Sequence, residues 1–203
     1  MKGFFIVFEG IDGAGKTTQA RLLAAALTRR GHPVVLTREP GGTPVGEKIR
    51  SLLLDPILAG LNPLAEALLY AGARAELVAR TIRPALARGR VVISDRFVDS
   101  SLAYQGYGRC LDLKELEQLN ALATGRLVAN LTVLLDMPAA GALARLAGRA
   151  DRIERERLEF FDRVRQGYLQ LVKRAPERYL VLDGRLDCQE LHRQILKAVE
   201  ERL

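Results

Sequence analysis

Eight consecutive residues near the start of the chain form a complete phosphate-binding loop. They follow the pattern G-x-x-x-x-G-K-[ST] and are Gly10, Ile11, Asp12, Gly13, Ala14, Gly15, Lys16 and Thr17. The glycines let backbone N–H groups turn toward phosphates, and the N-terminus of a following helix adds positive potential. Lys16 can neutralise the β- and γ-phosphates, and the Thr17 hydroxyl can bind Mg²⁺. The loop predicts binding of a nucleoside triphosphate with magnesium.

A chance glycine-rich turn is disfavoured because the loop directly follows an apolar run, residues 4–8, and opens a helical pattern. The loop alone does not separate a kinase from a GTPase or a motor. No N-K-x-D or T-K-x-D motif for reading guanine occurs in the chain. The pattern therefore favours a kinase that acts on a small molecule.

Asp95 and Arg96 are a second set of residues that could do chemistry, and they directly follow Val91-Val92-Ile93-Ser94, a largely apolar run. Ligands of an open parallel sheet bind outside the carboxyl ends of the strands, so this pair is expected beside the phosphate-binding loop. There Asp95 could order Mg²⁺ or the acceptor phosphate, and Arg96 could clamp an anionic acceptor. The alternative is a surface ion pair at a strand end. Asp136 ends a similar run, but Pro138 follows it, and we interpret Asp136 as shaping a loop near the ATP.

Five apolar runs alternate with longer helical patterns, which is typical of repeated strand–helix units. The predicted strands are residues 4–9, 34–38, 91–95, 131–136 and 179–183, and the predicted helices are residues 16–30, 66–88, 154–174 and 189–202. Nearly continuous Val, Ile, Leu and Phe indicate parallel strands covered on both faces. The fold class is therefore α/β, a five-stranded parallel sheet with helices on both faces, in one domain spanning residues 1–203. Residues 139–156, punctuated by arginines, are interpreted as a short lid.

The amino-acid composition limits the classes of partner that the chain is expected to bind. The 203 residues are 48% hydrophobic, which is enough for a well-buried core. A net charge of +7 indicates a phosphate-rich partner, but scattered basic residues and only 5% aromatic residues disfavour nucleic acid. Cys110 and Cys188 form no C-x-x-C pair, which fits a reducing compartment, and no apolar run approaches the ~18 residues of a membrane span. We expect a cytoplasmic protein without a membrane partner.

Three blocks of sequence resemble the thymidylate kinases, and the likeness covers essentially the whole chain. The blocks are residues 8–19, residues 37–43 (Thr-Arg-Glu-Pro-Gly-Gly-Thr) and residues 95–105, with Asp95-Arg96-Phe97, Ser100-Ser101 and Ala103-Tyr104-Gln105. Tyr70, Arg74 and residues 151–154 fall in the same order. The resemblance is to bacterial-type members with a basic lid. It implies a nucleoside monophosphate kinase fold, transfer of phosphate from ATP to dTMP with Mg²⁺, and a homodimer.

Three alternatives remain at this stage. They are another nucleoside monophosphate or deoxynucleoside kinase on the same scaffold, an ATP-binding switch without an acceptor and, third, a basic nucleic-acid binder, which salt-sensitive binding to a duplex would favour. For a thymidylate kinase, the resemblance implies the following site residues. ATP would be bound by Gly10, Ile11, Asp12, Gly13, Ala14, Gly15, Lys16, Thr17 and Thr18, and metal by Asp12, Thr17 and Asp95. The acceptor would be bound by Glu39, Pro40, Arg50, Tyr70, Arg74, Arg96, Ser101, Tyr104 and Gln105.

The chemistry of the acceptor residues agrees with the roles that the resemblance implies. Tyr70 and Arg74 are four residues apart in a helical pattern and share a face, where a ring and a guanidinium suit a pyrimidine. The alternative is a packed Tyr70 with a solvated Arg74. Arg50 and Arg96 are implied to hold the acceptor phosphate, although Arg50 could instead form a surface pair with Glu47. Tyr104 is implied to lie near the 2′ position of the deoxyribose.

The catalytic residues implied are Lys16, Asp95, Arg96 and one lid arginine. The loop interior contains no basic residue before Lys16, so the chain resembles members that carry the extra cations in the lid. Arg145, Arg149 and Arg152 are spaced by four and three residues, so a helical lid would align them. We predict that Arg149 stabilises the charge of the transferring phosphoryl group. The alternative is a solvated charged face.

Overall fold

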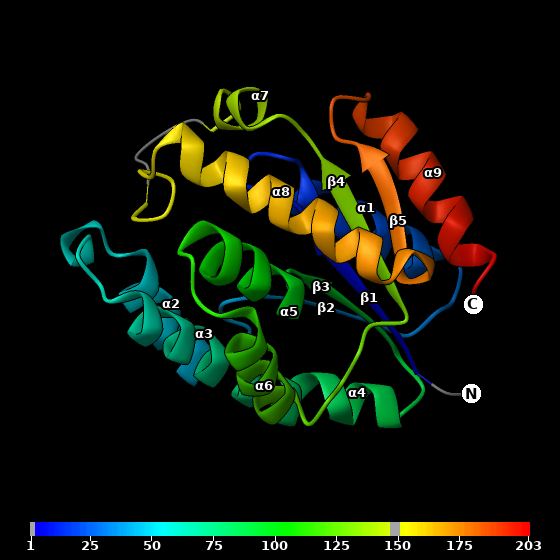
Figure 1. Ribbon diagram of the computed structural model, residues 1–203. Helices are drawn as coiled ribbons and strands as arrows, with labels where there is room; N and C mark the ends of the chain where they lie inside the picture. Colours follow the sequence, from blue (N-terminus) through cyan, green and yellow to red (C-terminus); the bar gives the residue numbers. More distant parts are fainter. Residues whose placement is uncertain (1–2, 147–150) are drawn as a thin grey trace.

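The five predicted strands form a single parallel sheet in a computed structural model, which describes residues 3–146 and 151–203 (Figure 1). The strands are β1 (Phe4–Glu9), β2 (Val34–Arg38), β3 (Val91–Asp95), β4 (Leu131–Asp136) and β5 (Tyr179–Asp183), in the order β2-β3-β1-β4-β5. Their bounds are those expected from the apolar runs, which confirms that prediction. Phe8 of β1 pairs with Asp95 of β3, so the carboxyl ends of these central strands meet at one edge.

Helices cover both faces of the sheet, which confirms the predicted fold class (Figure 1). Along β1, Phe5 and Val7 pack in one buried cluster with residues of α3 (Pro63–Leu77) and the π-helical turn η2 (Val78–Ile82). Ile6 and Phe8 point to the other face and belong to a larger cluster that includes α1 (Lys16–Arg29). The alternation follows from the two-residue period of a strand.

The remaining elements are helical and connect or flank the strands. They are α2 (Pro44–Leu54), η1 (Pro56–Leu58), α4 (Arg83–Ala87), α5 (Val98–Ser101), the π-helical η3 (Leu102–Gly108), α6 (Leu113–Thr124), α7 (Ala139–Leu143), α8 (Leu158–Arg174), η4 (Pro176–Arg178) and α9 (Cys188–Glu200). The predicted helix over residues 66–88 corresponds to α3, η2 and α4 in direct succession. Within the described residues, no helix combines the length and apolar character needed to span a bilayer.

The described part of the predicted lid, residues 139–156, does not form one continuous helix. Helix α7 ends at Leu143, and residues 152–155 form turns before α8 begins at Leu158. The Asp151 carboxylate accepts bonds from the backbone N–H groups of Ile153 and Glu154, which stabilises a turn. Helix α8 therefore begins later than the predicted residue 154.

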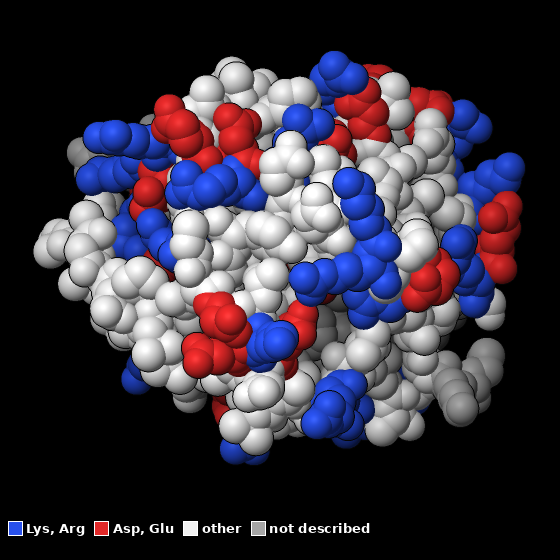
Figure 2. Space-filling view, in the orientation of Figure 1, with Lys and Arg blue, Asp and Glu red and all other residues white. Residues whose placement is uncertain are grey.

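Charged side chains are interspersed on the face shown in Figure 2. Basic side chains there lie beside acidic ones, and uncharged areas separate the groups. A nucleic-acid surface would present a continuous basic stripe, so this face lacks that signature.

Candidate active site

The phosphate-binding loop connects β1 to α1 and turns on glycines with a left-handed backbone. Gly13 has a φ of 82°, and a Cβ added there would lie 2.0 Å from the backbone oxygen of Ala142. Glycine is therefore required by both conformation and space. Lys16 is 6% exposed and donates from Nζ to the Ile11 carbonyl at 2.8 Å. Burial, together with the nearby charge of Arg96, lowers the pKa of Lys16 to about 8.

Thr17 and Asp95 are brought together at the carboxyl edge of the sheet. Thr17 lies in the first turn of α1, and its hydroxyl donates to the carboxylate of Asp95 at the end of β3. Two adjacent oxygens of this kind suit Mg²⁺, which prefers oxygen ligands and usually keeps several waters. Among the described residues, no group of three or more His, Cys, Asp or Glu side chains surrounds a common metal position.

Asp12, the third predicted metal residue, is directed toward the acceptor side. Its Oδ1 lies 2.5 Å from Nη2 of Arg96, and its Oδ2 accepts from the Tyr104 hydroxyl at 2.7 Å. Burial opposes its ionisation, but the charges of Arg96 and Lys16 prevail and lower the pKa of Asp12 to about 2. Asp12 is thus a stable anion between the phosphate-binding loop and the acceptor pocket.

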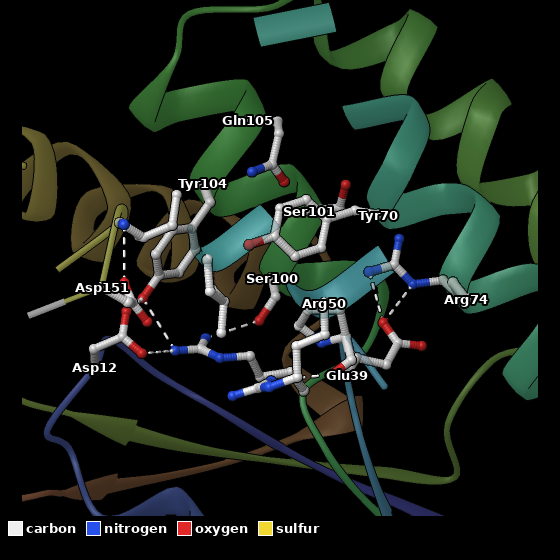
Figure 3. Close-up of a pocket in the computed structure, with 14 residues that line it drawn as sticks. Asp12, Glu39, Arg50, Tyr70, Arg74, Ser100, Ser101, Tyr104, Gln105 and Asp151 are labelled. Atoms are coloured by element: carbon white, nitrogen blue, oxygen red, sulfur yellow. Dashed lines mark hydrogen bonds and ion pairs between the residues drawn. The ribbon is translucent and has the colours of Figure 1, made fainter. Parts of the chain in front are cut away.

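One pocket contains all nine residues predicted to bind the acceptor (Figure 3). It encloses about 540 Å³, part of it open to solvent, which is the size of a small-molecule site. The predicted residues that line it are Glu39, Pro40, Arg50, Tyr70, Arg74, Arg96, Ser101, Tyr104 and Gln105. Asp12, Leu54, Ser100, Asp151 and Ile153 complete the wall. These residues come from six separate stretches of the chain, so only the fold brings them together.

Arg74 lies at one end of this pocket and is held rigidly. It is 1% exposed, donates from Nε to Glu39 at 2.7 Å and from Nη2 to the Phe97 carbonyl at 3.1 Å. Its Nη1 also donates to Asn120. Tyr70 lines the same pocket, as the four-residue spacing predicts, and burial raises the pKa of its hydroxyl. The alternative of a solvated Arg74 is wrong.

Arg96 joins the pocket to the phosphate-binding loop. Besides Asp12, its guanidinium bonds to the Gly10 carbonyl at 3.1 Å and to the Ser100 hydroxyl at 3.0 Å. It also lies over the ring of Tyr104, 4.9 Å from the ring centre. Its backbone has a φ of 74°, a conformation that L side chains rarely adopt and that often occurs at functional sites.

Arg50 approaches from α2 and donates from Nη1 to the Pro40 carbonyl at 3.0 Å. Glu47, its alternative partner, binds Arg38 instead, with both carboxylate oxygens 3.0 Å from Nη2. Arg50 and Arg96 line both the acceptor pocket and an adjoining cleft that contains Lys16 and Thr17. The two arginines therefore lie between the two sites.

Glu9 is a site residue that the sequence reasoning missed. Its side chain is fully buried at the end of β1 and accepts bonds from the Phe97 and Ser100 backbone, the Ser100 hydroxyl and the Tyr168 hydroxyl, at 2.6–3.2 Å. Burial and the neighbouring Asp99 raise the pKa of Glu9 to about 7. The sequence signal that could have identified Glu9 is a charged residue at the end of an apolar run. Its partners lie more than 80 positions away and could not be read from it.

The predicted lid arginines are not aligned in the described residues. Arg145 donates to the Gly184 carbonyl at 2.9 Å and lines the cleft beside the phosphate-binding loop. Arg152 is buried and forms an ion pair with Glu66 at 2.6 Å, because its side chain packs between α2 and α3. The expectation of a shared helical face is therefore wrong for these two. Arg149, the predicted catalytic lid residue, lies outside the described residues.

Known proteins resemble this chain in both sequence and structure. A family model described as thymidylate kinase matches residues 8–195. The thymidylate kinase of Pelotomaculum thermopropionicum is 57% identical over 204 residues, covering 99% of this chain and 94% of the relative. That of Desulforudis audaxviator is 58% identical over 186 residues, covering 91% and 84% respectively. A crystal structure of thymidylate kinase from Ehrlichia chaffeensis matches with a TM-score of 0.80 at 36% identity, covering 98% of this chain and 99% of that chain.

Proposed function

Because the chain belongs to the thymidylate kinase family, we propose that its acceptor pocket binds dTMP and that the adjoining cleft binds the phosphates of ATP. The protein phosphorylates dTMP to dTDP with ATP as the phosphate donor. One observation carries the assignment of the two sites. Asp12, Glu39, Arg50 and Arg96 line both cavities, so a phosphate on the acceptor and the terminal phosphate of the donor would meet between them.

Catalysis in this arrangement is positioning and charge stabilisation. Lys16 and Arg96 offer fixed cations to the phosphoryl group in transfer, and Arg50 and Arg96 orient the acceptor phosphate. The phosphate of dTMP is already ionised near neutral pH, so the reaction requires no strong general base. The two histidines, His32 and His192, line neither cavity, which agrees with this mechanism. We also propose that Arg149 of the lid supplies a further cation to the phosphoryl group in transfer.

Magnesium would be held by the Thr17 hydroxyl and the Asp95 carboxylate, whose oxygens already lie in contact. When bound there with the phosphates of ATP, Mg²⁺ would neutralise charge on the β- and γ-phosphates. Asp12 is a weaker candidate for direct ligation, since Arg96 and Tyr104 already engage its two oxygens.

The thymine ring would lie between Tyr70 and the fixed guanidinium of Arg74. A tyrosine face permits stacking, and Arg74 can offer an N–H donor to a ring carbonyl. The Ser101 hydroxyl is 2% exposed and has no hydrogen-bond partner among the described residues, so it is available to a ligand. A buried polar group of this kind discriminates strongly between acceptors that can and cannot pair with it.

Three further features complete the proposal. The chain acts as one domain, it forms a homodimer, and it works in the cytoplasm, where the exposed and unpaired Cys110 and Cys188 would stay reduced.

An acceptor screen tests the proposed function. Steady-state rates with ATP are measured for dTMP, dUMP, UMP, CMP, GMP and thymidine. We expect the highest kcat/KM for dTMP and no turnover of thymidine, which lacks the phosphate that Arg50 and Arg96 would hold. A higher kcat/KM for another monophosphate would contradict the assignment of the acceptor. ATP hydrolysis that is independent of every acceptor would favour a regulatory switch instead.

A further inference from the structure

Glu66 is a fully buried carboxylate that the mechanism above does not use. It lies on α3, one helical turn before Tyr70. Arg152 approaches its Oε2 at 2.6 Å, Gln105 donates from Nε2 to its Oε1 at 2.8 Å, and Arg109 contacts both oxygens at 3.3 Å. Two guanidiniums and one amide therefore converge on a single buried anion.

Arg152 ties a distinct stretch of chain, residues 151–156, to the body of the protein; we call this stretch the strap. Its Nε donates to the Leu53 carbonyl at 2.7 Å, and its backbone N–H donates to the Leu54 carbonyl at 3.2 Å. A second ion pair, between Arg109 and Glu156 at 2.5 Å, holds the far end of the strap. The strap is thus held at both ends, by Arg152 and by Arg109, and both arginines contact Glu66.

Stability alone is a poor explanation for this arrangement. Buried ion pairs often stabilise a protein no more than well-packed apolar side chains of similar volume do. In addition, Nη2 of Arg152 is buried without a hydrogen-bond partner among the described residues, which is unfavourable. The ion pairs around Glu66 therefore require an explanation other than the stability of the fold.

The neighbours of Arg152 and Glu66 form two walls of the acceptor pocket. Asp151 and Ile153, on either side of Arg152, both line the pocket, as does Leu54. Asp151 is labelled in Figure 3. Gln105 lines it from η3 and is 2% exposed, and its bond to Glu66 fixes the orientation of its amide. Movement of Glu66 or Arg152 would therefore displace groups that face the acceptor.

We propose that Glu66 and Arg152 are positioning residues that close the acceptor pocket over the nucleoside and so set the affinity for dTMP. This rests on the proposed function, in which that pocket binds dTMP. Among the described residues, Arg152 forms no hydrogen bond or ion pair with the phosphate-binding loop or with Arg96, so its loss should affect the transfer step less than the affinity for dTMP. The pair acts on the strap and on Gln105, and through them on the substrate.

The test replaces Arg152 with methionine, which has similar length and no charge. Calorimetry without ATP should give a dTMP Kd about tenfold or more above the wild-type value, whereas kcat at saturating dTMP should stay within about threefold of it. The strap contains trypsin sites at Arg152 and Arg155 and is followed by Arg157, so its release should speed tryptic cleavage after Arg155 and Arg157. The matched control is Arg157→Met, an exposed arginine just beyond the strap, which should leave the dTMP Kd unchanged.

A double-mutant cycle with Glu66→Met tests whether the two residues act together. Glu66→Met/Arg152→Met should raise the dTMP Kd by less than the product of the two single effects, because each single change already releases the strap. If Arg152→Met unfolds below the assay temperature, Arg152→Lys keeps the cation but cannot form the Nε bond to Leu53, and should raise Kd at least about threefold.

An unchanged dTMP Kd in a folded Arg152→Met or Arg152→Lys variant would overturn the proposal. So would a large fall in kcat with an unchanged Kd, which would make Arg152 a catalytic cation. If the wild-type chain prefers another monophosphate, the proposed function fails, but the tryptic comparison still decides whether Arg152 fastens the strap.

Discussion

Lys16 illustrates how a buried cation is prepared for a phosphate. In the nucleotide-free protein its pKa is lowered to about 8, whereas lysine in an unfolded chain titrates near 10.5. The unfolded chain therefore binds more protons between pH 8 and 10.5, and the contribution of Lys16 to stability becomes more favourable as pH rises through that window. Below pH 8 the buried charge opposes folding in full, and a bound phosphate would offset this.

Replacing Lys16 by methionine should separate catalysis from stability. We expect kcat to fall at least ~10²-fold, because the transferring phosphoryl group loses a fixed cation. The Tm of the nucleotide-free variant, measured near neutral pH, should not fall, because the buried charge is gone. Lys173→Met, at an exposed position on α8, is the control and should change neither quantity. Turnover close to that of the wild type would remove the assignment of the phosphate-binding loop.

Tyr104 combines two properties that can be tested separately. Its hydroxyl bonds to Asp12 at 2.7 Å, whereas its ring packs edge-on against Phe160 and Tyr168. We propose that this ring lies near the 2′ position of the acceptor sugar, where it would exclude a hydroxyl by clash.

Tyr104→Phe keeps the ring, so the preference for dTMP over its ribonucleotide should persist even if overall activity falls. Tyr104→Leu removes the ring and should lower that preference about tenfold or more, measured as the ratio of kcat/KM values. A ratio that stays fixed in both variants would make Tyr104 a packing residue only.

Among secondary-structure elements, the short helix α5 shows how β1 positions the acceptor site. Glu9 at the end of β1 accepts from the N–H groups of Phe97 and Ser100, at the start of α5. The segment that follows carries Ser101, Tyr104 and Gln105 into the pocket. A single buried carboxylate therefore fixes the direction in which this segment leaves the sheet.

The pKa of Glu9 predicts how stability varies with pH. It is raised from 4.5 to about 7, so the folded chain binds more protons than the unfolded chain between these values. Its contribution to stability is therefore present below pH 4.5 and is lost as pH rises through 7. Glu9→Gln should make the fall in Tm across this range smaller, and Asp99, Glu39 and Glu154, whose pKa values are also raised by burial, should contribute to what remains. Glu177→Gln, an exposed control, should keep the wild-type slope. An equal slope in Glu9→Gln would contradict the prediction.

The secondary-structure elements also show how much of the fold and of the site could be predicted from the sequence. The strands were predictable because each is a short apolar run, and the phosphate-binding loop because its chemistry is local. The role of Arg152 was not, because its partner Glu66 lies 86 positions earlier and no spacing rule reaches that far. Glu39 was expected to bind substrate, and the structure adds that it fixes Arg74. Contacts across the fold, rather than local patterns, account for both differences.

Across the whole molecule, basic side chains outnumber acidic ones, and the same holds in the cleft beside the phosphate-binding loop. The net charge is +7, and the cleft is lined by six basic residues, Lys16, Arg21, Arg38, Arg50, Arg96 and Arg145, and by four acidic ones, Asp12, Glu39, Asp95 and Glu154. The face in Figure 2 also mixes both signs. The basic excess in the cleft suits phosphorylated small molecules, whose negative charge it would partly neutralise.

Helix α3 has a second, outward face that suits a copy of the same chain. Leu64, Leu68 and Gly72 recur every four residues, and all three are exposed, with Leu64 at 55% and Leu68 at 52%. Glu66 and Arg74 on the same helix are buried on the acceptor side. A small residue among leucines lets another helix approach closely, and a symmetric dimer would bury this stripe against its own copy.

Leu68→Glu should therefore break the proposed homodimer. In a symmetric dimer the introduced carboxylate would face its own copy across the interface. Both charges would lose water and would repel each other, so each subunit adds to the free-energy cost of association. We expect sedimentation at micromolar concentration to show a dimer for the wild type and a monomer for Leu68→Glu. Val181→Glu, on the exposed edge strand β5, adds the same charge elsewhere and should stay dimeric. The monomer should also bind dTMP more weakly, because α3 carries Tyr70, Glu66 and Arg74 on its opposite side and loses its outer support. A monomeric wild type would refute the homodimer, and a dimeric Leu68→Glu variant would place its interface on another face.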